Sequence, residues 1–114
     1  MVFEAKRGPL CEAKQLVRLA QENAMKGDHS SAIHYLYKAI NKYPHYAEAY
    51  AQLGNCQDCL NNFEDAIISY NKALLLDPDN AETWFNKGMM LKKNGQPEAA
   101  KQCIEKSVDL FFGR

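Results

Sequence analysis

The chain has 114 residues and a mass of 12.9 kDa, with 46% hydrophobic and 25% charged residues. These values are typical of one folded globular domain and argue against disordered, collagen-like and disulfide-scaffold proteins. Fourteen Lys and Arg residues balance fourteen Asp and Glu residues, so no net positive charge attracts a nucleic acid or an acidic membrane, and we expect no nucleic-acid partner.

The N-terminal stretch 1–12 precedes any repeated pattern. Residues 1–7 lack the apolar core of a signal peptide, and no apolar run approaches the roughly 20 residues that span a bilayer. We therefore expect a soluble, cytoplasmic protein without membrane insertion. Pro9 suits the first position of an extended opening helix, and we expect the first few residues of the chain to be poorly ordered.

From residue 13 the sequence repeats with a period of 34 residues. Seven residues are identical between the first and second units, and seven again between the second and third, against about two expected from ordinary residue usage. The chain therefore divides into an N-terminal extension at 1–12, which partly joins the first helix, and three units at 13–46, 47–80 and 81–114.

Each unit predicts two amphipathic helices, because apolar residues recur at helical spacing on both sides of a central break. The breaks are pairs that tolerate the left-handed conformation after a helix: Gly27-Asp28, Asn61-Asn62 and Gly95-Gln96. Small residues at equivalent positions let the two helices of a unit cross closely, with Ala20, Gly54 and Gly88 facing Ala32, Ala66 and Ala100.

These units resemble the tetratricopeptide repeat, whose signature combines aromatic residues with Leu-Gly, Ala and Pro. The middle unit carries the pattern most fully, with Tyr50, Leu53, Gly54, Ala66, Tyr70, Ala73 and Pro78. The chain departs from the signature at Asn23, Gln57 and Leu91, where the family often has an aromatic residue. The resemblance covers 13–114 and implies an all-α, right-handed superhelical solenoid of three helix-turn-helix units.

The resemblance also implies a concave groove, lined by the first helix of each unit, that binds a protein or peptide ligand. Its positions fall on Lys14, Val17, Arg18, Gln21, Met25, Glu48, Ala51, Gln52, Asn55, Cys59, Glu82, Phe85, Asn86, Met89 and Lys93. Amides there can bond a peptide backbone, and large apolar side chains can accept an apolar residue. We predict a binding site at Val17, Arg18, Gln21, Gln52, Asn55, Phe85, Asn86 and Met89.

Some members of the family clamp the acidic carboxylate end of chaperone tails with Lys, Asn and Arg side chains. The equivalent positions here hold Val17, Gln21, Gln52, Glu82 and Asn86. None of these is a cation, and a carboxylate needs charge-assisted donors to offset its desolvation. We predict that this chain is not a carboxylate-clamp binder of chaperone tails.

Charge differs between the units. The first carries five cations and two anions, the second one cation and six anions, and the third six cations and four anions. Such bands favour attraction between neighbouring units or toward a charge-patterned partner. The alternative is a solvated surface without a role, because exposed charges are screened within about 8 to 10 Å at physiological salt.

The last unit gives conflicting signals about the end of the stack. Lys101 stands where the earlier units have Ile33 and Ile67, as expected of a solvated terminal face. An apolar strip nevertheless remains, formed by Ile104, Val108, Phe111 and Phe112. The alternative function is therefore an assembly scaffold that weakly self-associates through this end, or an attachment point for a following segment of a longer protein.

Four cysteines occur without a secretory signal, so we expect reduced thiols. Cys56 and Cys59 have the spacing of a redox or half-zinc motif, and a metal or redox site is kept as a third hypothesis beside simple packing. The sequence contains no phosphate-binding loop, nucleophile elbow or metalloprotease motif. We therefore expect a non-catalytic adaptor without catalytic residues, metal or cofactor.

Overall fold

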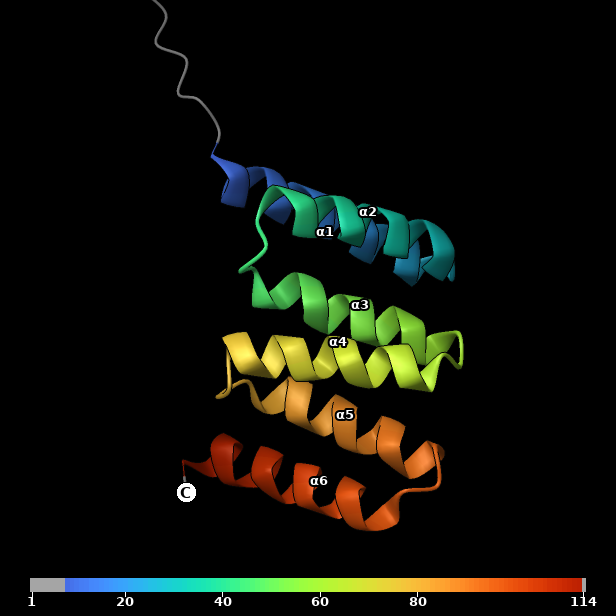
Figure 1. Ribbon diagram of the computed structural model, residues 1–114, viewed down its shortest axis with the longest axis vertical. Helices are drawn as coiled ribbons and strands as arrows, with labels where there is room; N and C mark the ends of the chain where they lie inside the picture. The colour runs from blue at the N-terminus through green and yellow to red at the C-terminus, as the bar shows by residue number, and fades with distance from the viewer. Residues whose placement is uncertain (1–7, 114) are drawn as a thin grey trace, which may run out of the picture.

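The structure is a computed structural model that describes residues 8–113. The described chain forms six helices and no strand: α1 (Pro9–Met25), α2 (His29–Lys42), α3 (Ala47–Cys59), α4 (Phe63–Leu76), α5 (Ala81–Lys93) and α6 (Pro97–Phe112). Figure 1 shows them stacked along the longest axis as three antiparallel hairpins. The expected poor order of the first few residues concerns a part of the chain outside the described residues.

Each hairpin turns at a residue with a positive φ angle, because the chain must reverse directly after a helix end. These residues are Gly27 (φ 84°), Asn61 (φ 62°) and Gly95 (φ 77°), which confirms the three breaks that the sequence predicts. The helix that follows the first turn is capped by Asp28, whose carboxylate accepts a hydrogen bond from the backbone N–H of Ser31 at 3.1 Å.

The hairpins stack with a consistent asymmetry. The first helices contact one another, α1 with α3 and α3 with α5, whereas no such contact joins α2 with α4 or α4 with α6. The first helices therefore lie on the inner, concave side of the stack and the second helices on the outer, convex side. The described residues form an all-α solenoid, as the sequence predicts, with a radius of gyration of 15.4 Å.

The core divides into two clusters of buried side chains. The first joins α1 and α2 to α3, with Leu36 and Leu53 among its members, and the second joins α4 to α5 and α6, with Tyr70 and Met90 at its centre. α3 carries residues of the first cluster and α4 residues of the second, and these two helices pack together as the middle hairpin. The solenoid therefore depends on this crossing for its continuity.

Glycines permit the close crossings. A Cβ added to Gly88 would lie 3.1 Å from the carbonyl oxygen of Ala100, which agrees with the predicted pairing. A Cβ added to Gly54 would lie 2.7 Å from Cδ1 of Tyr70, and one added to Gly88 would lie equally close to Cγ1 of Ile104, one period after Tyr70. In both units the nearest neighbour that requires glycine is thus the side chain one turn beyond the facing alanine, and in the middle unit it is an aromatic ring.

A buried hydrogen bond also joins α3 to α4. The Ser69 hydroxyl donates to Oε1 of Gln57 at 2.6 Å, and both residues are buried. Gln57 departs from the repeat signature, and the bond supplies the reason that a polar side chain is tolerated here. The equivalent residues of the third unit, Leu91 and Cys103, fill the same space without such a bond.

We predict that Ser69→Ala lowers the free energy of unfolding by about 1 to 3 kcal/mol, because it leaves the buried Gln57 amide without its donor. The double variant Gln57→Leu, Ser69→Ala removes both polar groups and should recover most of that loss. Urea denaturation followed by circular dichroism measures both values. A double variant less stable than Ser69→Ala would show that packing, rather than the hydrogen bond, fixes this crossing.

Candidate functional site: the concave groove

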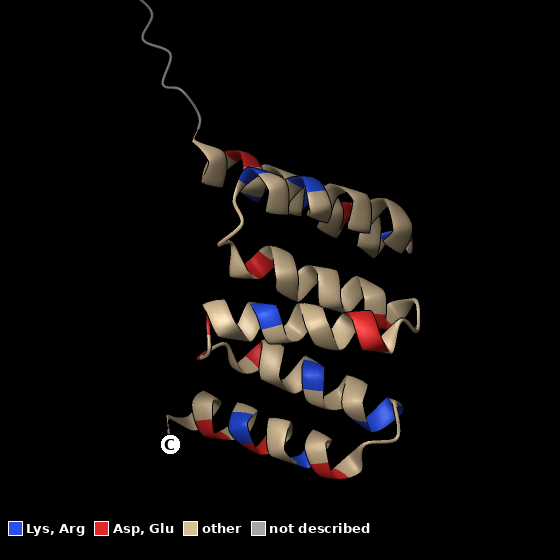
Figure 2. Cartoon of the chain, viewed as in Figure 1, with Lys and Arg blue, Asp and Glu red and all other residues tan. Residues whose placement is uncertain are grey.

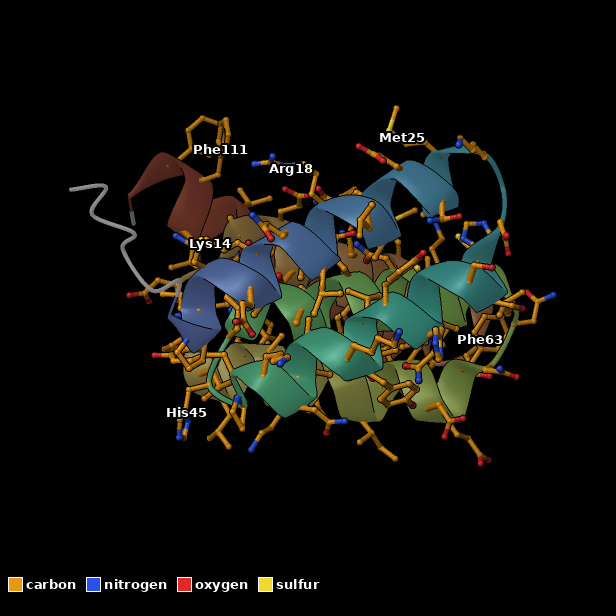
Figure 3. The ribbon with its side chains drawn as sticks, turned by 90° about the horizontal axis from the view of Figure 1, so that it is seen from above. Lys14, Arg18, Met25, His45, Phe63 and Phe111 are labelled. Atoms are coloured by element: carbon orange, nitrogen blue, oxygen red, sulfur yellow. The ribbon has the colours of Figure 1, made fainter. Side chains whose placement is uncertain are left out.

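The candidate site is the surface formed by the outward faces of α1, α3 and α5, which we call the concave groove. In Figure 3 Lys14, Arg18 and Met25 point away from the stack on one side, and Phe111 lies on the same side. His45 and Phe63 lie on the opposite side. The groove therefore extends from α1 to the end of α6.

The centre of the groove holds an amide pair, Asn55 on α3 and Asn86 on α5. Oδ1 of Asn55 accepts two hydrogen bonds, from the Tyr70 hydroxyl at 2.7 Å and from Nδ2 of Asn86 at 3.3 Å. Nδ2 of Asn55 is then left to donate, and Oδ1 of Asn86 is left to accept. Because burial raises the pKa of the Tyr70 phenol above its ordinary value, this hydroxyl remains protonated and keeps donating at neutral pH.

One end of the groove is a hollow of about 460 Å³ between α1 and the start of α3. It is lined by Lys14, Val17, Arg18, Gln21, Tyr46 and Glu48. Val17 is only 3% exposed, so it forms the floor and offers less apolar surface than the sequence suggests. Nearby, Nε2 of Gln52 donates to Oε1 of Glu48 at 2.9 Å, which commits part of the Gln52 amide to its own helix.

The other end of the groove is apolar. Phe85 is 45% exposed and Met89 is 39% exposed, as a ligand-contacting position requires. Phe85 lines a hollow of about 320 Å³ with Val108, Phe111 and neighbouring residues of α6. The predicted binding residues and the predicted self-association strip therefore meet in one apolar surface, lined by Phe85, Val108, Phe111 and Phe112, which we call the apolar end.

Ile104 does not belong to the apolar end. Its Cγ1 would lie 2.7 Å from a Cβ added to Gly88, so its side chain packs between α5 and α6. The sequence placed Ile104 with Val108 and Phe111 because all three fall on one side of the helix. Because Gly88 on the facing helix has no side chain, it leaves space for Ile104 to pack inside the hairpin.

Lys93 also differs from the remaining groove positions. Its Nζ lies 2.6 Å from Oδ1 of Asp58, whose side chain is mostly buried, and 5.9 Å from the centre of the Phe63 ring. The Lys93 charge therefore neutralises a carboxylate of the preceding unit. This contact pairs a cation of the third unit with an anion of the second, whose net charges are opposite in the sequence, and Figure 2 shows the charged residues along both units.

The thiols of the Cys56–Cys59 motif lie in different environments. Cys56 is buried and Cys59 is exposed. Burial raises the pKa of the Cys56 thiol to about 11, so this side chain is a protonated thiol at neutral pH. Within residues 8–113, no three His, Cys, Asp or Glu side chains gather closely enough to hold a metal ion.

Two residues that contribute to the concave groove were not predicted from the sequence. Tyr70 matches the repeat signature as a core aromatic, but its hydroxyl also reaches the amide pair. Tyr46 precedes α3 and lines the hollow beside Lys14. For Tyr70, the sequence does contain a signal, namely Tyr instead of Phe at a core position, because a buried phenol normally has a hydrogen-bond partner.

None of the helices described between residues 8 and 113 is long and apolar enough to cross a membrane.

Comparisons with known proteins agree with this architecture. Two tetratricopeptide repeat families match, one at residues 47–80 and one at residues 69–102. The SGT1 homologue of Bos taurus is 31% identical over 85 residues, which cover 75% of this chain and 25% of that protein. The chain thus spans about a quarter of the length of this relative.

Two solved structures have the same fold. The crystal structure of MamA superposes with a TM-score of 0.83 at 24% identity, covering 90% of this chain and 60% of that one. The second tetratricopeptide domain of Spaghetti (RPAP3), bound to the HSP90 peptide SRMEEVD, has a TM-score of 0.83 at 20% identity, covering 87% of this chain and 92% of that one. The chain belongs to the tetratricopeptide repeat family, and its described residues 8–113 form six helices in three hairpins.

Proposed function

We propose that the chain is a non-catalytic protein interaction module that holds an extended peptide segment in its concave groove. The observation that carries the proposal is the amide pair. The free donor of Asn55 and the free acceptor of Asn86 match the C=O and N–H of one residue in an extended peptide, because these two groups point to the same side of an extended chain. An amide pair of this kind recognises a main chain whatever its side chains are.

The two ends of the groove provide side-chain selectivity. Lys14 and Arg18 border one hollow, and Phe85 with Phe111 borders the other. We therefore assign the apolar end to a large apolar side chain of the ligand, because burying such a side chain contributes about 1.5 to 3 kcal/mol. The similarity to a repeat domain that holds a peptide supports a groove ligand of this type.

The groove is not suited to the acidic tail held by that similar domain. The positions assigned to carboxylate recognition carry Val17, Gln21, Gln52, Glu82 and Asn86, none of which is positive. Glu82 is exposed at the apolar end, where it repels a carboxylate. We infer that a neutral or apolar segment is preferred there.

A second function rests on the exposure of the apolar end. Phe111 is 78% exposed and Phe112 is 66% exposed, and their rings pack edge to face with centres 5.2 Å apart. An exposed aromatic surface of this kind marks an interaction site. We propose weak self-association through this end as the alternative function, which makes the chain an assembly scaffold.

The first prediction concerns the anchor. A peptide selected from a displayed library of short random sequences should bind Phe85→Ala more weakly by about 1 to 3 kcal/mol, as expected for an interface anchor. Asn55→Ala should weaken the same peptide, while Ile68→Gln, on the convex side, serves as the matched control. Isothermal titration calorimetry gives the affinities. Equal binding to the parent and Phe85→Ala would contradict the assignment of the apolar end.

The peptide SRMEEVD should bind much more weakly than a library-selected peptide, because the groove offers its carboxylates no cations at the equivalent positions. Glu82→Lys should raise its affinity by replacing a repulsive charge with an attractive one. Fluorescence anisotropy of the labelled peptide measures both effects. Tight binding of SRMEEVD to the parent would contradict the predicted absence of a carboxylate clamp.

The alternative function predicts that the parent chain forms larger species as its concentration rises. The variant Val108→Glu, Phe111→Glu should remain monomeric, because charges at the apolar end oppose its burial. Light scattering over a concentration series detects the difference. A parent that stays monomeric at the highest concentration would remove self-association and leave the peptide groove as the function of this end.

A further inference from the structure

A second surface lies on the convex side of the stack, where α2 and α4 do not contact each other. Figure 1 shows α3 between them. The space above α3 is a groove of about 390 Å³, at the lower end of the range for ligand pockets. We call it the convex groove, and it is lined by Tyr37, Ile40, Tyr50, Leu53, Gln57, Asp65, Ile68, Ser69 and Lys72.

The rim of the convex groove is apolar and exposed. Ile68 is 66% exposed and Tyr37 is 51% exposed, and they stand on opposite walls. Leu53 lies beneath them as part of the floor. A large exposed apolar surface of this kind marks a contact with another molecule more often than it serves the fold.

The repeat supplies an internal comparison for this rim. One period further along the chain, Asn71 stands for Tyr37 and Gln102 for Ile68. The same fold is therefore built with polar residues at both rim positions. Since neither the hairpin nor the stacking requires apolar residues at these exposed positions, the convex groove between the first two units owes them to another constraint.

Charges of opposite sign flank the apolar rim. Asp65 and Lys72 lie on α4 on either side of Ile68, seven residues or about 10 Å apart along the helix. Neither residue takes part in the ion pairs Lys42–Glu12 and Lys93–Asp58, and both are exposed. The groove thus presents an anion, an apolar surface and a cation in order along α4.

The floor of the groove favours a helix as occupant. Its polar side chains, Gln57 and Ser69, are only 6% and 5% exposed, so they offer an additional main chain little contact. An extended peptide would leave its N–H and C=O groups unpaired against Leu53 and Ile68, whereas a helix satisfies its own backbone. The apolar walls then accept the side chains of one helical face.

We propose that the convex groove binds a short amphipathic helix of another protein. The bound helix inserts apolar side chains between Tyr37 and Ile68. It also carries a cation and an anion two turns apart, which face Asp65 and Lys72. This site is independent of the concave groove, because none of its residues lines the hollows that contain Lys14 or Phe85.

The test uses a displayed library of helices of about 15 residues, in which one face is randomised in an Ala, Glu and Lys background. Helices that bind the parent are synthesised and titrated against the variant Tyr37→Asn, Ile68→Gln. This variant carries the residue types that the chain has one period later, at Asn71 and Gln102. Phe85→Ala is the matched control on the concave side. Thermal unfolding of each variant verifies that it folds.

The proposal expects selected helices with large apolar residues and with opposite charges two turns apart. Their affinity should fall at least about tenfold in the double variant and stay unchanged in Phe85→Ala. Lys72→Glu should weaken helices that carry the anion, and exchanging that anion for Lys should restore binding.

Three results would overturn the proposal. One is a library that yields no helix with higher affinity for the parent than for the double variant. Another is a set of selected helices without the paired charges, or one that is insensitive to Lys72→Glu. The third is a parent dimer, detected by light scattering, that the double variant abolishes, because a second copy of the chain would then occupy the convex groove.

Discussion

The packing of the Tyr70 ring on the α3 backbone at Gly54 is the contact on which the rest of the structure depends. It fixes the crossing of α3, which belongs to the first core cluster, and α4, which belongs to the second, and it leaves no space for a Cβ atom on the facing helix. The same side chain places its hydroxyl on Asn55 and so orients the amide pair of the concave groove. A buried core residue thereby determines which hydrogen-bonding atoms face the concave groove, because a fixed phenol leaves the Asn55 amide one favourable orientation.

Both candidate surfaces follow from unequal spacing in the stack. The first helices contact each other and bring Asn55 and Asn86 within hydrogen-bonding distance across two repeats. The second helices remain apart, and the space between α2 and α4 becomes a groove with an apolar rim. One surface offers paired amides suited to a main chain, and the other offers aliphatic and aromatic side chains suited to the face of a helix. A single geometric property thus gives a small solenoid two chemically different surfaces.

Departures from the repeated pattern are more informative than the pattern itself. Positions that all three units share serve packing. A residue that differs between units therefore indicates a structural or functional requirement specific to its own unit. Gln57 is such a case, because its bond to Ser69 replaces the apolar contact made by Leu91 in the next unit. Ile68 is another, since Gln102 occupies the equivalent position without loss of the fold. The first departure is explained by a contact inside the protein, whereas the second side chain is exposed and has no such internal contact among the described residues to explain it.

The sequence by itself determined the period of 34 residues, the hairpin breaks and the all-α class, because helical periodicity and the left-handed turn residues act over a few positions. It also identified Phe85 and Met89 as exposed apolar residues of the groove. Only the tertiary structure decided that Lys93 neutralises Asp58, that Ile104 packs against Gly88, and that Tyr70 orients Asn55. These contacts join different helices, and their geometry depends on how closely the two backbones approach each other. The spacing of residues along one helix gives no information about that distance.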